Sequence, residues 1–124
     1  MLSVSNLTTS YGLIKALNAV SLVAKEGQVT CILGPNGAGK TTLMFTLAGI
    51  LKPASGSVKF DGIEIAGLGA PKVLQSGVSP NAKGRFALRF QMNGMAAGSC
   101  SRWRNVLSFC HASESCVFVS GKGC

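Results

Sequence analysis

The sequence has 124 residues, the length of a single ordinary domain, which leaves no room in it for a second full-sized one. Apolar residues make up 47% and charged residues 13%, which excludes a wholly disordered chain. Twelve Lys and Arg against four Asp and Glu give a net charge of +8, which favours an anionic partner such as a nucleotide, a nucleic acid or a membrane surface. No apolar run of about 18 residues and no signal peptide is present, so a cytosolic chain without a transmembrane segment is expected.

Three strands are predicted before the first glycine-rich segment. Leu2 and Val4 alternate with serines, which predicts a half-buried strand, and a second strand-like stretch covers residues 16–23. After turn residues at 25–28, the apolar and β-branched run 29–33 predicts a strand in the interior of a sheet. Cys31 is expected there as a small core residue, and its distance along the chain from the other four Cys argues against a disulfide framework.

A phosphate-binding loop follows this strand directly. Residues 34–42 read GPNGAGKTT and match G-x-x-x-x-G-K-[ST] at every defined position. The glycines let backbone N–H groups turn inward toward a phosphate, and the following helix adds its positive dipole end. We expect Lys40 at the β- and γ-phosphates, the Thr41 hydroxyl on Mg²⁺ and the Thr42 hydroxyl near the α-phosphate. The expected nucleotide-binding residues are Gly34, Pro35, Asn36, Gly37, Ala38, Gly39, Lys40, Thr41 and Thr42.

The context of the loop separates it from a glycine-rich turn with an incidental lysine, because the motif requires a strand before it and a helix after it. Leu43, Leu47, Ile50 and Leu51 are spaced as one apolar face of a helix that ends before Pro53. Both required elements are therefore predicted.

A β-hairpin is predicted over residues 58–65, with Asp61 and Gly62 as its two-residue turn. Asp61 as a metal ligand is the alternative, but Asp tolerates the positive φ that this turn requires. The apolar members should share one face and the charged pair the other. The expected cross-strand pairs are Val58 with Ile65, Phe60 with Ile63, and Lys59 with Glu64.

Residues 1–79 resemble the N-terminal part of an ATP-binding cassette (ABC) subunit, the ATPase component of membrane transporters. Tyr11, between the first two predicted strands, lies at the expected offset from the phosphate loop. Residues 10–12 together with 33–43 are most similar to the branched-chain amino acid uptake group of that family. The matching segments are 11–12, 16–22, 26–28, 32–43 and 49–62.

The resemblance implies an α/β fold of the P-loop NTPase class, namely the N-terminal portion of an ABC-type nucleotide-binding domain with antiparallel β strands. It implies ATP and Mg²⁺ as ligands, with Tyr11 stacked on the adenine. It also implies membrane permease subunits and a second ATP-binding subunit as partners. These partners would hold the chain peripherally on the cytoplasmic face of the cell membrane, and no nucleic-acid partner is expected.

Two parts that hydrolysis needs in this family are missing from the 124 residues. After Glu64 the next acid is Glu114, and no apolar strand leads into it, so the second acidic motif is absent. The signature loop is absent too, since residues 119–123 share two letters with it. Gln91 lies too far along the chain to serve as the γ-phosphate-sensing residue expected near Ser79. We therefore assign no catalytic residue and expect little or no ATP hydrolysis.

The composition changes near residue 80, where the resemblance also ends. Residues 1–79 carry a net charge of +3 and residues 80–124 carry +5, with all four Arg, the Trp and four of the five Cys in the second segment. We divide the chain into a partial ABC-type ATP-binding domain, 1–79, and a basic, Cys-rich tail of unknown or no fold, 80–124. One hypothesis is a shifted or rearranged reading frame near codon 80, which translation of the other two frames tests.

The tail leaves further functions open. Interleaved Arg and aromatic residues are compatible with a single-stranded nucleic-acid surface, although no domain motif of that class accompanies them. A metal site lacks any C-x-x-C pair, so thiols without a metal are favoured. Three alternative functions therefore remain for the chain. It is a transport ATPase subunit, a binding-only or vestigial nucleotide-binding fragment, or a nucleic-acid binder. The residues behind these alternatives are Arg85, Phe86, Arg89, Phe90, Arg102, Trp103 and Arg104, and Cys100, Cys110, His111, Cys116 and Cys124.

Overall fold

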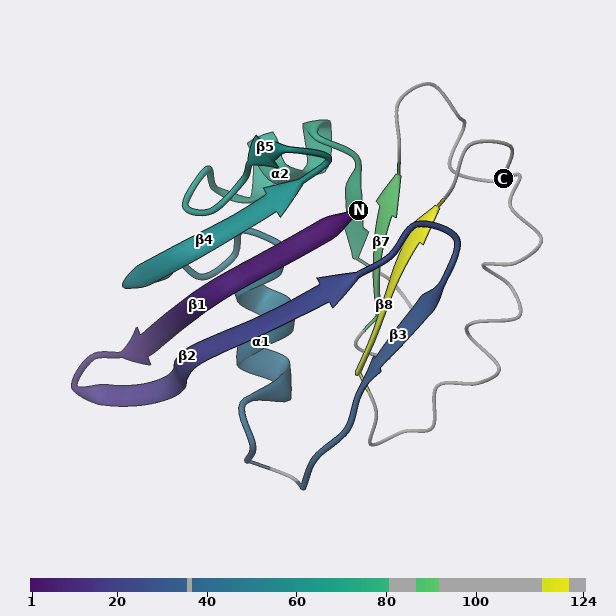
Figure 1. Cartoon of the computed structure of the whole chain (residues 1–124). Coiled ribbons are helices and arrows are strands. Elements are labelled where there is room, and N and C mark those ends of the chain that lie inside the picture. The colour runs from purple at the N-terminus through teal and green to yellow at the C-terminus, as the bar shows by residue number, and fades with distance from the viewer. Residues whose placement is uncertain (36, 81–86, 92–114, 121–124) are drawn as a thin grey trace.

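The computed structural model describes residues 1–35, 37–80, 87–91 and 115–120, with side chains as far as residue 78 (Figure 1). These described residues form two sheets and two short helices. In chain order the elements are β1 (Leu2–Tyr11), β2 (Ile14–Ala24), β3 (Val29–Ile32), α1 (Lys40–Leu47), β4 (Ser55–Phe60), β5 (Ile63–Glu64), α2 (Ala70–Gln75), β6 (Val78–Pro80), β7 (Ala87–Gln91) and β8 (Ser115–Ser120).

The two sheets have four strands each. The first has the order β2-β1-β4-β5 and is antiparallel throughout, and the second has the order β3-β8-β7-β6 (Figure 1). In the second sheet β7 and β8 run parallel, while the other two pairs are antiparallel. Two of its strands, β7 and β8, lie within residues 80–124, so this sheet joins the two compositional segments of the chain.

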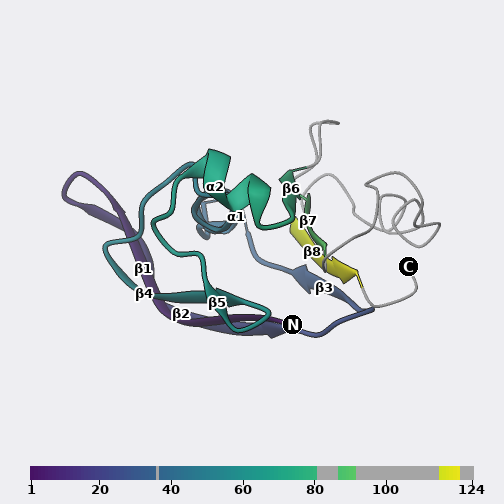
Figure 2. The same ribbon diagram turned by 90° about the horizontal axis from the view of Figure 1, so that it is seen from above.

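The hydrophobic core lies between the first sheet and the helices. Figure 2 shows α1 and α2 on the same side of that sheet. One face of β1 alternates as expected, with Leu2 and Val4 buried and the serines between and after them less so. Burial of these aliphatic side chains supplies most of the favourable free energy of folding. The core consists of Leu2, Val4, Leu7, Leu17, Ala24, Leu43, Met44, Leu47, Ala48, Val58, Phe60, Ile65, Val73 and Val78.

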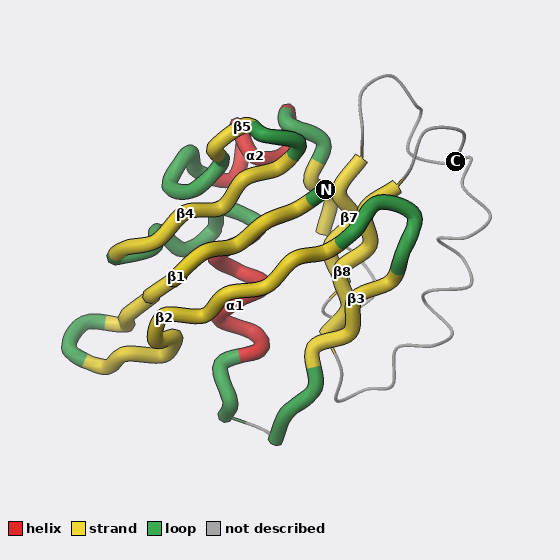
Figure 3. The backbone as a smooth tube through the Cα atoms, in the orientation of Figure 1, coloured by secondary structure: helices red, strands yellow, loops and turns green. Residues whose placement is uncertain are grey.

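Strand β3 lies at the edge of its sheet, so the prediction of an interior strand is wrong for the described residues (Figure 3). Its residues alternate between exposed and half-buried, because only one face of the strand is covered. Cys31 belongs to the exposed set and is not a core residue. An apolar run can indicate an interior strand, but its actual position depends on strands that are distant in sequence.

Three register shifts interrupt the long pairing of β1 with β2. They lie between Val4 and Leu7, between Leu7 and Thr9, and between Thr9 and Ser10, and both Asn6 and Ala19 have positive φ. The backbone N–H of Asn6 donates to Ser21 Oγ over 2.9 Å, and that of Ala19 donates to Thr8 Oγ1 over 3.1 Å. The two hydroxyls thus replace hydrogen bonds that the register shifts remove from the ladder. Strand β1 therefore continues beyond the point where buried and exposed side chains stop alternating.

Helix α1 ends at Leu47, earlier than the apolar spacing predicts. Gly49 has a φ of +75°, and the N–H groups of Gly49 and Ile50 donate to the carbonyls of Thr46 and Phe45. These two bonds form the Schellman motif that commonly closes helices. Leu43 and Leu47 are buried as predicted, but Ile50 lies beyond the helix and is 58% exposed.

The predicted β4–β5 hairpin is confirmed. Asp61 and Gly62 have φ values of +50° and +81°, as the two-residue turn requires, and Phe60 pairs with Ile63. The expected apolar face is only partly correct, because Ile63 is 64% exposed at the edge of the sheet. The other side of this hairpin carries the predicted pair of Lys59 with Glu64.

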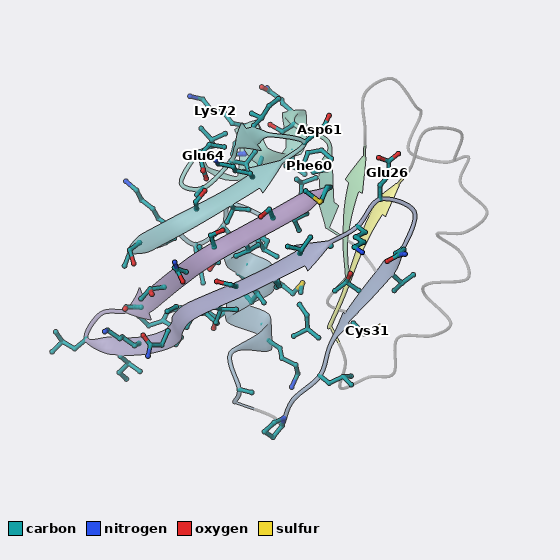
Figure 4. All side chains as sticks on the ribbon, in the orientation of Figure 1. Glu26, Cys31, Phe60, Asp61, Glu64 and Lys72 are labelled. Carbon is teal, nitrogen blue, oxygen red and sulfur yellow. The ribbon has the colours of Figure 1, made fainter. Side chains whose placement is uncertain are left out.

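The carboxylate of Glu64 stabilises this hairpin through hydrogen bonds (Figure 4). One oxygen accepts the backbone N–H groups of Val58, at 2.8 Å, and Ala66, at 3.1 Å, and the other accepts the Ser57 hydroxyl. Burial acts to raise the pKa of Glu64, but these three hydrogen bonds and the nearby Lys59 charge outweigh it, and the net effect is a pKa below its ordinary value.

We expect Glu64→Gln to change how stability depends on pH. The folded-state pKa lies below the unfolded one, so the carboxylate stabilises the fold at neutral pH and loses this contribution as the pH falls through the folded pKa. Urea unfolding from about pH 7 to about pH 3 should show wild type more stable at neutral pH and the difference shrinking with acid. A constant difference contradicts this role. Glu26→Gln, in the turn before β3, is the control with the same change of charge.

Candidate functional site: a phosphate-binding loop

The loop predicted from residues 34–42 connects β3 to α1, and the helix begins at Lys40. Gly37 and Gly39 have φ values of +85° and +86°, so two of the three glycines adopt the left-handed conformation that the curled loop needs. Gly34 meets a milder constraint, since a β-carbon there would lie 3.3 Å from that of Ala38. Asn36 lies outside the described residues.

Gly39 lies where the loop meets strand β2. A β-carbon on this residue would be 2.7 Å from the carbonyl oxygen of Ala16 and 3.0 Å from Cδ2 of Leu17. Glycine is therefore required twice over, by the backbone conformation and by the close approach of another strand. This packing anchors the end of the loop, and with it the start of α1, against the first sheet.

The first turn of α1 presents backbone donors. The earliest intrahelical bond runs from the N–H of Leu43 to the carbonyl of Gly39, at 2.9 Å, so the N–H groups of residues 40–42 precede the helical ladder. The N-cap residue Gly39 supplies no side-chain cap, and the first turn contains no acidic residue. These N–H groups and the positive end of the helix dipole favour an anion at this position.

Lys40 spans the loop with its side chain. Its Nζ donates to the carbonyl oxygens of Gly34 and Pro35, the latter at 2.8 Å, and the N–H of Ala38 donates to the same Pro35 oxygen at 3.2 Å. The ammonium group therefore lies at the start of the loop, on the carbonyl oxygens of Gly34 and Pro35. A cation and several N–H donors converge on one short segment, which is an arrangement suited to phosphate oxygens.

The two threonines differ in their surroundings. Thr41 is exposed, whereas Thr42 is buried, and its carbonyl accepts the hydroxyl of Thr46 over 2.8 Å. Thr46 Oγ1 in turn lies 3.1 Å from Thr9 Oγ1 of strand β1. This buried chain of hydrogen bonds ties the first turn of α1 to the sheet and was not predicted, because residues 9, 42 and 46 form no local pattern.

An exposed hydroxyl oxygen at Thr41 is the hard type of ligand that Mg²⁺ takes, so the residue present fits a magnesium ion held jointly with phosphate. Among the residues whose side chains the structure describes, no group of three or more His, Cys, Asp or Glu could hold a metal ion by itself.

Tyr11 ends strand β1 at the tip of the β1–β2 hairpin. It pairs with Ile14 and is 47% exposed. Strand β2 continues from Ile14 to Ala16, whose carbonyl lies against Gly39. The hairpin thus brings an exposed aromatic ring to the strand that borders the phosphate loop.

Most of the predicted features of the tail lie outside the described residues, including Arg85, Trp103, His111 and Glu114. Gln91 ends β7 and Cys116 lies in β8, where the structure describes the backbone alone. The described helices include none that is long and apolar enough to cross a bilayer.

Comparison with known proteins agrees with this geometry. The chain is 40% identical over 85 residues to the high-affinity branched-chain amino acid transport ATP-binding protein BraG of Pseudomonas aeruginosa, covering 68% of this chain and 36% of that protein. It is 39% identical over 114 residues to the phosphonates import ATP-binding protein PhnC 1 of Natronomonas pharaonis, covering 92% and 48%. The chain thus spans between about a third and a half of these relatives.

A solved structure and a family model also match proteins of ABC transporters. A crystal structure of a nucleotide-free ATP-binding cassette from an ABC transporter superposes with a TM-score of 0.60 and 36% identity, covering 62% of this chain and 30% of that one. The model of the ABC transporter family matches residues 17–99, a range that includes the whole phosphate loop and extends past Ser79. By this match, which covers more than half of its residues, the chain belongs to the ABC transporter family.

Proposed function

We propose that this chain is the ATP-binding part of an ABC importer and that it binds Mg·ATP through residues 34–42. The observation that carries the proposal is the convergence, on one loop, of the Lys40 ammonium and the N–H groups of residues 40–42. Gly37 and Gly39 give the loop the curled backbone that lets these groups face one anion.

Each loop residue has a proposed role at the nucleotide. Lys40 would exchange its bonds to the Gly34 and Pro35 carbonyls for the β- and γ-phosphates. Thr41 would place its hydroxyl on Mg²⁺, which neutralises phosphate charge when bound. Thr42, fixed through its carbonyl by Thr46, would hold its own hydroxyl near the α-phosphate. The other loop positions, Pro35, Asn36 and Ala38, would contribute backbone contacts.

We further propose that the transported substrate is a branched-chain amino acid. The identity to BraG, a protein named for that transport, supports this, whereas the similarity to PhnC 1 concerns a protein named for phosphonates. In such a transporter, permease subunits and a second ATP-binding subunit would be the partners, and the chain would work at the cytoplasmic face of the membrane. Co-purification with a branched-chain amino acid permease rather than a phosphonate permease is the expected result.

The 124-residue chain should bind nucleotide without appreciable turnover. It contains neither an apolar strand ending in the second acidic motif nor the signature loop. Calorimetric titration with Mg·ATP should show saturable binding, and phosphate release should not exceed that of a Lys40→Ala variant. Absence of binding would overturn the proposed function, and clear turnover by wild type would overturn the binding-only part of it.

The position of the boundary at residues 79/80 is also a proposal. The change in charge and Cys content supports it, whereas the family match ending at residue 99 favours a later boundary. Limited proteolysis followed by mass spectrometry distinguishes the two, because a protected fragment should end near residue 80 in the first case and near residue 100 in the second.

Tyr11→Ala should weaken ATP binding while leaving inorganic triphosphate binding unchanged. Stacking of a base on an aromatic ring is worth roughly 1–3 kcal/mol, which corresponds to about a 5- to 100-fold loss of ATP affinity. Tyr11→Phe keeps the ring and is the matched control. Equal losses for ATP and triphosphate would show that Tyr11 shapes the loop and does not contact the adenine.

A further inference from the structure

Strands β3 and β8 bring two cysteines into register although 84 residues separate them in the chain. The antiparallel pairing places Cys31 opposite Cys116, and the neighbouring pairs, Thr30 with Val117 and Ile32 with Ser115, continue without a register shift. The juxtaposition is therefore part of a regular ladder and not of an irregular strand end.

Directly opposed residues of antiparallel strands are suited to a disulfide bond. Such residues lie on the same face of the sheet, with Cα atoms about 4.5–5.5 Å apart. Disulfide-bonded cysteines have Cα atoms about 4.4–6.8 Å apart, so the two ranges overlap. The bond needs no movement of the backbone when the strands are already paired in this register.

Cys31 is also accessible. It lies on the edge strand of its sheet and belongs to the exposed positions of β3 (Figure 4). The strand leads directly into the phosphate loop at Gly34. Because the Cys31 side chain is exposed, a small oxidant can reach its thiol while the core stays folded.

We propose that Cys31 and Cys116 form a reversible disulfide bond, which makes this strand pair a redox modification site. The oxidant is a low-molecular-weight disulfide of the glutathione type. The Cys31 thiolate attacks one sulfur of the oxidant, forms a mixed disulfide and releases one reduced thiol. The Cys116 thiolate then attacks the Cys31 sulfur and releases the second thiol. Two protein thiols are oxidised, the oxidant is reduced to two thiols, and the two protons end on them.

Equilibration of the full, reduced chain with mixed reduced and oxidised glutathione tests the proposal. Remaining thiols are blocked with an alkylating agent, and peptides are mapped by mass spectrometry before and after reduction. The expected result is one dominant linked peptide that joins Cys31 to Cys116 and disappears on reduction. Predominant linkage of Cys31 to another cysteine, or capture of Cys31 as a glutathione adduct alone, would overturn the proposal.

Two further measurements show whether the strand register, and not random pairing of cysteines, favours the bond between Cys31 and Cys116. The variant with Cys100→Ser, Cys110→Ser and Cys124→Ser keeps the proposed pair and should form the bond at the same glutathione ratio, whereas Cys31→Ser should abolish it. In concentrated urea, where the strands are unpaired, the wild-type preference for Cys116 should fall at least several-fold. An unchanged preference in urea would show that the strand register is not its cause. The wild-type peptide map remains decisive even where a variant fails to fold.

Discussion

Gly39→Ala should destabilise the fold more than any other single change in the loop. A side chain here must adopt the left-handed conformation at a φ of +86°, at a cost of about 1–2 kcal/mol. Its β-carbon must also displace the Ala16 carbonyl, which would lie only 2.7 Å away, and such overpacking costs about 1–3 kcal/mol more. A total of about 2–5 kcal/mol is a large share of the stability of a small domain. Urea unfolding followed by far-UV circular dichroism measures it.

Gly37→Ala is the matched control for this prediction. Gly37 has nearly the same φ, +85°, but a β-carbon there meets nothing within 4 Å. The control therefore carries the conformational cost without the steric one, and Gly39→Ala should be the less stable variant by about 1–3 kcal/mol. Equal losses for the two variants would mean that the contact between the loop and β2 does not constrain the fold.

Lys40→Ala should cause the largest loss of nucleotide affinity. The ammonium group is the only side-chain cation of the loop, and hydrogen bonds to charged groups are worth about 1.5–3 kcal/mol each. Loss of one such bond predicts an ATP affinity about 10- to 100-fold lower. Titration calorimetry with Mg·ATP provides the measurement.

Two further variants test whether the loss of affinity comes from the charge of Lys40. Lys72→Ala, in α2, makes the same change of charge away from the loop and should retain wild-type affinity. Lys40→Met keeps the length of the side chain but removes the charge and the bonds to Gly34 and Pro35. It should lose affinity as Lys40→Ala does. Wild-type affinity in Lys40→Met would show that the side chain acts through packing and that its charge is dispensable.

Features decided by neighbouring residues were predictable from the sequence. The Asp61-Gly62 turn needs two positive φ values, and the residues that tolerate them stand at those positions. The turn and two of the three expected cross-strand pairs, Lys59 with Glu64 and Phe60 with Ile63, were therefore predicted correctly. A helix after the loop was predictable as well, because the motif requires one there, and α1 begins directly after Gly39.

Features decided by distant residues were not predictable in this way. Strand β1 extends to Tyr11 because the hydroxyls of Ser21 and Thr8 accept backbone N–H groups where the register shifts. The alternation of apolar and polar residues does not predict these hydrogen bonds. The edge position of β3 depends on β8, a strand more than 80 residues away.

Helix α2 was missed for a different reason. It has six residues, too few to show an apolar period, although Pro71 at its start is a known helix signal. In the site, Thr9 and Thr46 were missed because their hydrogen bond links a strand to a helix.

Residues 34–42 should bind the phosphates of ATP through backbone N–H groups and Lys40. The most direct test is a two-dimensional ¹H–¹⁵N spectrum of the chain, recorded during titration with Mg·ATP. The amide signals of residues 37–42 should shift most, and inorganic triphosphate should shift the same signals while adenosine does not. Saturable ATP binding that leaves these amides unmoved would contradict it.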